Sequence, residues 1–317
     1  MNITSNVICS TKINEKQYYD RMDQSLGDKR TILSLIDPSS SSILDYGAGT
    51  GKLSAELSRL YKNAMITAFD SSPQSIEMLK EIKSTRKNFE IIPIEMIHRN
   101  PGSILSIDFF KTFNPGRFDT IIFSSVLHEI YSLERYRGKL FNPDSVIDTL
   151  AAAINALTPT GQIIIRDGIK PLMTDIVNVR IKDEDFSKRC NRFLEVFQGH
   201  YIPFSIKRIS EKEFIYKMKY SDAMEMLYTC TWGEQSFPRE VKEQYGYFNC
   251  KEWAQAIDMI QKRLVSQKDR IYMKHFREYF QEDYKTHLQF VTIYSETNPN
   301  YPLPFPNTNS IIVIQKF

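Results

Sequence analysis

Three glycines at alternate positions form the clearest chemical signal in this sequence. Gly47, Gly49 and Gly51 close the stretch 43–51, which reads Ile-Leu-Asp-Tyr-Gly-Ala-Gly-Thr-Gly. Because glycine has no side chain, its backbone can approach a ligand closely, and the helix after such a turn offers free N–H groups to the same ligand. The stretch therefore predicts a binding site, although similar turns hold NAD or FAD in some proteins and nothing in others.

The spacing of these glycines argues against two common phosphate-binding loops. The dinucleotide fingerprint needs a glycine three residues after its second one, where this chain has Lys52, or Ser54 when the count starts at Gly49. The stretch is not a Walker A loop either. Asp70 ends the next apolar run, where a carboxylate can accept hydrogen bonds from both hydroxyls of a ribose. The turn and this acid together predict a ribose-bearing cofactor.

Strand and helix patterns alternate around these residues. Apolar runs with strand character are at 43–46, 64–69, 89–94, 118–124 and 162–166. Helical patterns are at 18–36, 53–60, 73–82 and 150–157. Ser72 and Pro73 supply an N-cap and a first-turn proline for the third helix. This alternation implies right-handed crossovers and a mainly parallel sheet, so we expect an α/β fold.

With these elements in place, the chain resembles the class I S-adenosylmethionine-dependent methyltransferases. The first motif of that family is an acidic residue followed by GxGxG, which matches Asp45-Tyr-Gly-Ala-Gly-Thr-Gly here. The resemblance continues through 69–72 (Phe-Asp-Ser-Ser), 118–129 and 157–167, and it covers about residues 40–170 and the tail strands. One departure is Thr160, which replaces the usual glycine before Gly161.

The resemblance implies S-adenosyl-L-methionine as the cofactor and assigns roles to the matched residues. Asp45 would lie near the ammonium group of the cofactor, Asp70 would bind the ribose hydroxyls, and Glu95 is the candidate for the adenine contact. Asp45 and Asp70 could alternatively act only in capping or ion pairing. The complete implied set is Asp45, Gly47, Ala48, Gly49, Gly51, Asp70, Ser71, Glu95, Ser124 and Ser125. No metal is expected.

His128 and Glu129 are the candidate catalytic residues. A sulfonium is already an activated methyl donor, so the protein must mainly align the acceptor and exclude water, and a base is optional. His128 follows the fourth strand, on the side where ligands bind in open α/β sheets, and can take a proton near neutral pH. Glu129 could orient it or serve alone. His128 could equally cap or pack the following helix.

We expect the chain to have three parts. Residues 1–40 form an N-terminal helical segment. Residues 41–171 and 286–317 form a Rossmann-like domain, whose mainly parallel seven-stranded sheet ends in a C-terminal antiparallel hairpin of strands at 288–294 and 311–315. Residues 172–285 are a large helical insertion after the fifth strand, with capping boxes that begin at Ser210 and Asn249.

The insertion is where an acceptor would bind. Its aromatic residues either line an acceptor pocket or form the core of a small subdomain. They are Tyr201, Phe204, Tyr228, Trp232, Phe237, Tyr245, Tyr247, Phe248 and Trp253. A helical cap of this kind resembles those of small-molecule methyltransferases, which favours transfer to an O or N nucleophile of a small-molecule acceptor.

Two other functions stay open. Basic residues interleaved with aromatic ones at 135–139, 207–208 and 262–277 could track RNA, or they could form a solvated helix face. RNA or protein is therefore the alternative acceptor, and a scaffold subunit without activity is the second alternative. DNA is not expected, because the fourth-strand motif lacks Asn/Asp-Pro-Pro-Tyr and the chain has no Pro-Cys pair.

The composition is that of a globular protein. Hydrophobic residues make up 42%, charged residues 25%, and the net charge of +3 does not demand an anionic partner. The four cysteines form no CxxC pair, which fits a cytoplasmic protein better than a zinc cluster or a disulfide framework. We expect neither a secretory signal nor a membrane span, and the sequence does not indicate an oligomeric state.

Overall fold

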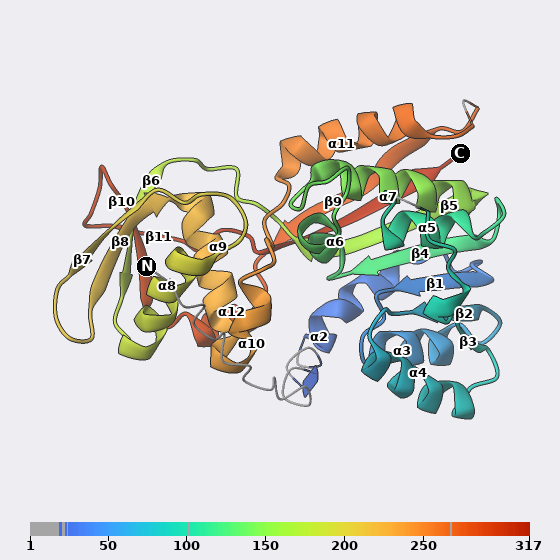
Figure 1. Ribbon diagram of the computed structural model, residues 1–317, viewed down its shortest axis with the longest axis horizontal. Coiled ribbons are helices and arrows are strands. Elements are labelled where there is room, and N and C mark those ends of the chain that lie inside the picture. Colours follow the sequence, from blue (N-terminus) through green and yellow to red (C-terminus); the bar gives the residue numbers. More distant parts are fainter. Residues whose placement is uncertain (1–18, 21–22, 24, 101, 267) are drawn as a thin grey trace, which may run out of the picture.

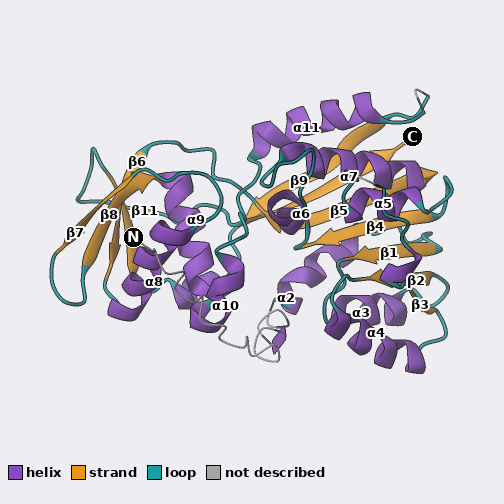
Figure 2. Ribbon diagram, viewed as in Figure 1, coloured by secondary structure: helices purple, strands orange, loops and turns teal. Residues whose placement is uncertain are grey.

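The computed structural model describes residues 19–20, 23, 25–100, 102–266 and 268–317. These residues form two lobes, each built around one sheet (Figures 1 and 2). The larger lobe has a seven-stranded, mostly parallel sheet between helices, and the smaller lobe has an antiparallel sheet of five strands. The Rossmann-like α/β class predicted from the sequence is confirmed.

The large sheet brings the ends of its parallel strands to one edge. Its order is β3-β2-β1-β4-β5-β12-β9, in which β1 to β5 are parallel and β12 is antiparallel to both neighbours. The strands are β1 (Ser42–Tyr46), β2 (Met65–Phe69), β3 (Phe89–Ile91), β4 (Phe118–Ser124), β5 (Leu157–Gly168), β9 (Ile271–Tyr279) and β12 (Asn309–Lys316). Strand β4 points toward the smaller lobe (Figure 1), so the carboxyl ends of the parallel strands face that lobe.

Helices cover both faces of this sheet and bury strands that are apolar on both sides. One face carries η1 (Arg30–Leu35), α3 (Lys52–Leu60) and α4 (Pro73–Thr85), and the other carries α5 (Leu105–Lys111), α7 (Pro143–Ala156) and α11 (Cys250–Arg263). The shorter helices are α2 (Leu26–Lys29), η2 (Ile94–Met96) and α6 (Leu127–Leu133). Ser72 caps α4 as predicted, and Asn249 with Glu252 forms a complete capping box on α11.

The smaller lobe has its own apolar core. Its sheet has the order β11-β10-β6-β8-β7, and the helices pack against it. The elements are β6 (Ile176–Ile181), α8 (Glu184–Val196), β7 (Phe204–Arg208), β8 (Phe214–Lys219), α9 (Tyr220–Thr231), α10 (Gly233–Glu240), α12 (Asp283–His287), β10 (Val291–Ser295) and β11 (Pro302–Leu303). On β6, Val177, Val179 and Ile181 alternate toward this core.

Part of the predicted topology is wrong. The partner of β12 is β9, whereas the segment 288–294 contributes β10 to the small sheet. On β10, Val291 and Ile293 are buried in the small core, whereas β9 is an edge strand whose charged residues hide its strand character in the sequence. The large sheet therefore still ends in an antiparallel pair, but a different segment supplies one strand.

The insertion is also not purely helical. Strands β6, β7 and β8 lie within residues 172–285, and Ser210 is in the turn between β7 and β8 instead of at a helix start. The backbone N–H of Ser210 donates to the carbonyl of Glu213, so the two residues close a hairpin. At the N-terminus, residues 19, 20 and 23 are helical and α2 begins at Leu26, whereas residues 18, 21, 22 and 24 of the predicted helix lie outside the described residues. None of the helices in the described ranges is long and apolar enough to cross a membrane.

Candidate functional site

Two cavities meet at the carboxyl edge of the parallel strands. The first, which we name the loop cavity, has a volume of about 410 Å³ and is lined by the glycine turn, Asp70 and the start of α6. The second, the inter-lobe cavity, has a volume of about 110 Å³ and is lined by residues of both lobes. Ser125 and Glu129 line both cavities, so a ligand in one adjoins a ligand in the other.

The glycine turn is shaped so that side chains could not replace its hydrogens. Gly47 has a φ of +76° and lines the loop cavity, and a Cβ there would lie 2.7 Å from Val126. Gly51 has a φ of +75°, and its Cβ would lie 2.5 Å from Ile82, so this glycine lets α3 and α4 pack. The backbone N–H groups of Gly47 and Ala48 donate to the carbonyl of Phe69 at 2.9 Å, which joins the turn to β2.

Asp70 fixes the turn from the end of β2 and also lines the loop cavity. Its carboxylate accepts the backbone N–H groups of Gly49 and Ser72, each at 2.8 Å. A carboxylate has about four acceptor sites, so these two bonds leave capacity for a ligand. Ser71 follows it along the same wall. Asp70, the residue predicted to bind ribose, therefore lies beside the glycine turn, as the sequence analysis expected.

Asp45 lies beneath the turn instead of in the loop cavity. It is buried, accepts a hydrogen bond from the Ser54 hydroxyl, and lines a small recess with Ala48 and Lys29. Burial raises the pKa of Asp45 to about 6, although Ser54 and Lys29 oppose that shift. Burial likewise lowers the pKa of Lys29 to about 8. Asp45 can thus act on a ligand only through this recess behind the glycines.

Two serines after β4 occupy different positions. Ser124 is buried, lines the loop cavity, and its hydroxyl has no hydrogen-bond partner among the described residues. Ser125 has a φ of +59°, an unusual conformation for a residue other than glycine. Arg166 holds it there by donating to its hydroxyl at 2.5 Å and accepting its backbone N–H at 2.8 Å. The hydroxyl of Ser124 is therefore available to a ligand in the loop cavity.

Glu95 was predicted to contact the cofactor, but it lies outside the loop cavity. It is exposed on η2 and does not belong to the lining of the loop cavity, where Arg99 lies instead. The segment after β3 turns at Pro93 into a short 3-10 helix, which directs Glu95 toward solvent. An adenine contact by Glu95 therefore has no geometric support here.

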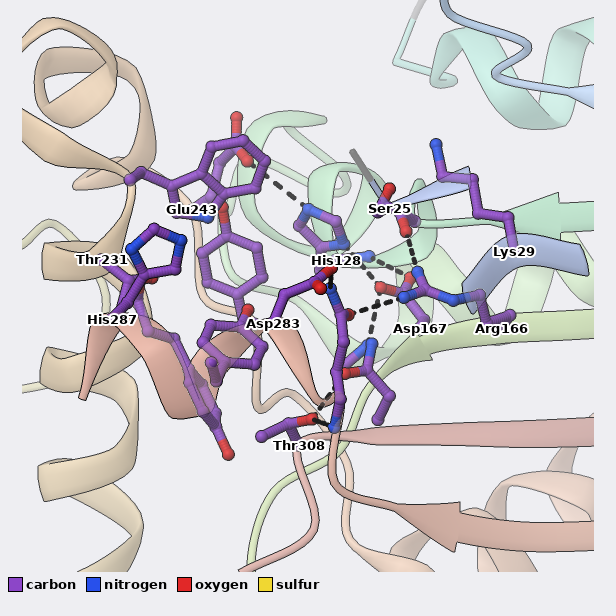
Figure 3. Close-up of a pocket in the computed structure, with 18 of the residues that line it drawn as sticks. Ser25, Lys29, His128, Arg166, Asp167, Thr231, Glu243, Asp283, His287 and Thr308 are labelled. Carbon is purple, nitrogen blue, oxygen red and sulfur yellow. Dashed lines mark hydrogen bonds and ion pairs between the residues drawn. The ribbon is translucent and has the colours of Figure 1, made fainter. Parts of the chain in front are cut away.

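His128 is buried at the start of α6, between two carboxylates (Figure 3). Asp167 Oδ1 lies 2.7 Å from its Nδ1, Asp167 Oδ2 accepts its backbone N–H at 3.1 Å, and Glu243 Oε2 lies 3.5 Å from its Nε2. Burial lowers the pKa of the imidazole, but Asp167 and Glu243 outweigh burial and hold the pKa of His128 well above its ordinary value. The two carboxylates therefore favour the protonated form of the ring.

Glu129 follows His128 in the chain and lines both cavities. Its carboxylate pairs with Arg239 at 3.2 Å, and Arg239 also lies 3.4 Å from Glu243. Burial and the charge of Glu243 raise the pKa of Glu129 to about 7. A carboxyl that titrates near neutrality and lines a cavity can take up a proton during a reaction.

Several residues of this site were not identified from the sequence. Arg166 and Asp167 end β5, so the rule that drew attention to His128 could have found them as well. Arg239 and Glu243 belong to the insertion, and only the packing of the two lobes brings them beside His128. Asp28 is a third case, because α2 places it on the buried guanidinium of Arg166.

Some aromatic residues of the insertion line a cavity, and others form apolar cores. Tyr228, Trp232 and Tyr245 line the inter-lobe cavity. Tyr247, Phe248 and Trp253 are buried in the core of the large lobe, and Phe237 is in the core of the small one. Tyr201 and Phe204 are exposed.

Comparison with known proteins finds one family model that matches this chain. A family model described as a methyltransferase domain matches residues 37–228, which is more than half of the chain. A search of curated proteins gave no match.

The solved structures that are similar to this chain have low sequence identity to it. The plantazolicin methyltransferase BamL, solved with a triazolic desmethylPZN analog and SAH, is 14% identical with a TM-score of 0.49, over 97% of this chain and 92% of that one. The mitomycin 7-O-methyltransferase MmcR is 12% identical with a TM-score of 0.49, over 97% of this chain and 59% of that one. A SAM-dependent methyltransferase from Archaeoglobus fulgidus is 8% identical with a TM-score of 0.48, over 95% and 99%. With TM-scores below 0.5, these similarities assign no acceptor to this chain.

Proposed function

The chain belongs to the methyltransferase-domain family, as a class I S-adenosylmethionine-dependent member, and on that premise we propose that it methylates an O or N nucleophile of a small-molecule acceptor bound between its lobes. The observation that carries the proposal is the junction of the two cavities at Ser125 and Glu129. A donor in the loop cavity and an acceptor in the inter-lobe cavity would meet there.

The loop cavity has the features that S-adenosylmethionine requires. Gly47 leaves room where a Cβ would collide with Val126, Asp70 offers acceptor capacity for ribose hydroxyls, and Ser124 has a buried hydroxyl without a partner among the described residues. When bound, the donor supplies a methyl group already activated on a sulfonium. The protein then has to bind, orient and exclude water.

Between the two candidate bases, the charges favour Glu129. His128 is held in its protonated form by Asp167 and Glu243, so it orients those carboxylates and offers a hydrogen bond. Glu129 lines the junction and has a pKa of about 7, so its carboxylate can accept the proton that a nucleophile gives up. We assign proton acceptance to Glu129 and positioning to His128.

The charge pattern supports a small-molecule acceptor over RNA. Arg137 and Arg263, from two of the basic segments, both pair with Asp144 and Asp148. These arginines are therefore neutralised by carboxylates, as the solvated-face interpretation requires. The inter-lobe cavity, at about 110 Å³, also suits a small ligand.

Two measurements test the proposal. Calorimetric titration with S-adenosylmethionine should give a binding heat, and labelled methyl groups incubated with fractionated cell extract should appear in the metabolite fraction. Label in RNA or protein would exclude the small-molecule acceptor, and the absence of any binding heat would exclude the enzyme altogether.

A further inference from the structure

The inter-lobe cavity has an acidic wall. Glu129 and Glu243 line it, with Asp167 behind His128. Glu240 is buried next to them, where it accepts a hydrogen bond from Tyr245 through one oxygen, while its Oε1 has no partner among the described residues. Carboxyl groups without matching cations are costly to bury, so this wall is suited to a ligand that brings positive charge.

The cations near this wall do not balance it. His128 and Arg239 are shared among Glu129, Glu243 and Asp167. Arg166, next to Asp167, is hydrogen-bonded to Asp28, Ser125 and Gln281. Burial and the charge of Arg166 lower the pKa of Lys29 to about 8, although Asp45, Asp23 and Asp28 oppose that shift. Among the described residues, the three carboxyl groups of Glu129, Glu243 and Asp167 therefore share two cations, His128 and Arg239, while the raised pKa of Glu240 keeps that carboxyl neutral near pH 7.

Aromatic rings face the same space. Tyr228, Trp232, Tyr245 and Tyr284 line the cavity, and the rings of Tyr228 and Tyr284 lie 5.2 Å apart. Figure 3 shows Thr231 and His287 on the side of the small lobe and Lys29 and Arg166 on the other, so the cavity is a slot between the lobes. Aromatic faces attract organic cations, whereas they offer no ligand atoms to a metal ion.

We propose that the acceptor is an organic amine, bound as its ammonium by Glu129 and Glu243 against these rings, and that its nitrogen is the atom that is methylated. This inference rests on the proposed function and narrows its acceptor class. Glu129 is the carboxylate that lines both cavities, so the nitrogen it binds is also the group that faces the donor.

The step balances with groups already present. The ammonium gives one proton to the Glu129 carboxylate, and the freed nitrogen lone pair forms a bond to the methyl carbon. The carbon–sulfur bond breaks with its electron pair moving to sulfur, so the sulfonium becomes a neutral thioether. The nitrogen now carries the positive charge of the methylammonium product, and Glu129 later releases its proton to solvent.

A divalent metal ion is the competing occupant. Ligand atoms of His128, Glu129 and Glu243 all lie within 4.8 Å of one another. Four aromatic side chains, however, line the same cavity, and their ring faces attract an organic cation but supply no ligand atoms to a metal ion. These contacts favour the ammonium, and the experiment below includes zinc as a separate arm.

Trp232 allows binding to be measured directly. The chain has two tryptophans, of which Trp253 is fully buried in the core of the large lobe. Fluorescence changes on titration therefore report on Trp232, and a Trp232→Phe variant should abolish them. The probes are 2-phenylethylamine and 2-phenylethanol, which have nearly the same shape and differ in charge, titrated with S-adenosylhomocysteine present.

We expect the amine to bind at least about ten-fold more tightly than the alcohol, and any methyl transferred from S-adenosylmethionine to be on nitrogen. Glu129→Gln and Glu243→Gln should each reduce that preference to about two-fold or less. Glu77→Gln, at an exposed position paired with Lys80, is the matched control and should leave it unchanged.

Equal affinity for the two probes, failure of both to change Trp232 fluorescence, or methylation on the oxygen of the alcohol would overturn the amine assignment. Tight binding of zinc alone, without discrimination between the probes, would also overturn it in favour of a metal site. In each case, a binding heat with S-adenosylmethionine on the same preparation would leave the proposed function standing. The absence of that heat would mean that the proposed function itself had failed.

Discussion

The carboxylate of Asp167 contacts His128 at two points, the imidazole ring and the backbone N–H. Oδ1 lies 2.7 Å from Nδ1, and Oδ2 accepts the backbone N–H at 3.1 Å. The same carboxylate accepts the N–H of Gly168 at 2.8 Å. The end of β5 thereby sets the direction in which the imidazole presents Nε2 to Glu243, and so the shape of the acidic wall.

Asp167→Asn tests this positioning role. The amide cannot accept all three hydrogen bonds, so we expect kcat to fall about ten- to a hundred-fold while calorimetry shows donor affinity within two-fold of wild type. Without the carboxylate charge, the pKa of His128 should fall toward its ordinary value, which would shift the pH profile of kcat. Asp185→Asn, at an exposed position on α8, is the control. A fall in kcat with no change in the pH profile would indicate a purely structural role.

The part of the candidate site around the loop cavity could be predicted because its signals are local. The glycines, Asp70 and the Ser72 cap lie within one strand-turn-helix unit and its neighbour, where spacing alone sets the geometry. The position of Glu95 outside the loop cavity could not be predicted, because it depends on how the chain turns after β3, and a three-residue 3-10 helix gives no periodic signal.

The part of the candidate site around the inter-lobe cavity could not be predicted because its residues meet only through tertiary packing. Glu243 and Arg239 are more than a hundred positions from His128 and Glu129, and nothing in their spacing relates the two pairs. The two capping boxes show the same limit. Asn249 starts a helix, whereas Ser210 closes a hairpin, because β8 pairs with β6 and draws that segment into a sheet.

Glu240→Gln should change how stability depends on pH. Burial and the charge of Glu243 raise the pKa of Glu240 from 4.5 to about 8. Because the folded pKa lies above the unfolded one, its contribution to stability is fully present below pH 4.5 and is lost as pH rises through 8. The neutral amide avoids that loss, so the variant should match wild type near pH 5 and exceed it at pH 9, by at most about 5 kcal/mol.

Thermal or urea unfolding at the two pH values measures this difference. Glu234→Gln, at an exposed position paired with Arg192, should show no comparable gain at pH 9. A Glu240→Gln variant less stable than wild type at pH 9 would mean that the carboxylate is stabilised where it lies.

Gly47→Ala should abolish donor binding. The new Cβ would lie 2.7 Å from Val126 at a φ of +76°, so the turn must move. Gly116→Ala is a matched control, because its φ is +83° and nothing lies within 4 Å of its Cβ. Both variants should lose about 1 kcal/mol from the left-handed conformation, but only the first should lose calorimetric binding of S-adenosylmethionine. Equal donor affinity in the Gly47→Ala and Gly116→Ala variants would show that the glycine turn does not bind the cofactor.

Ser124→Ala should affect stability and donor affinity in opposite ways. Its buried hydroxyl has no partner among the described residues, so removing it should leave the free energy of unfolding unchanged or raise it by up to about 1 kcal/mol. If that hydroxyl binds the donor, the loss of this hydrogen bond should weaken calorimetric affinity about five- to thirty-fold. Ser187 on α8 also has a buried, unpartnered hydroxyl, but it lies in the small lobe away from the loop cavity. Ser187→Ala should reproduce the stability effect without the loss of affinity, so a shared loss would point to a change in folding, and no loss in either would remove Ser124 from the donor site.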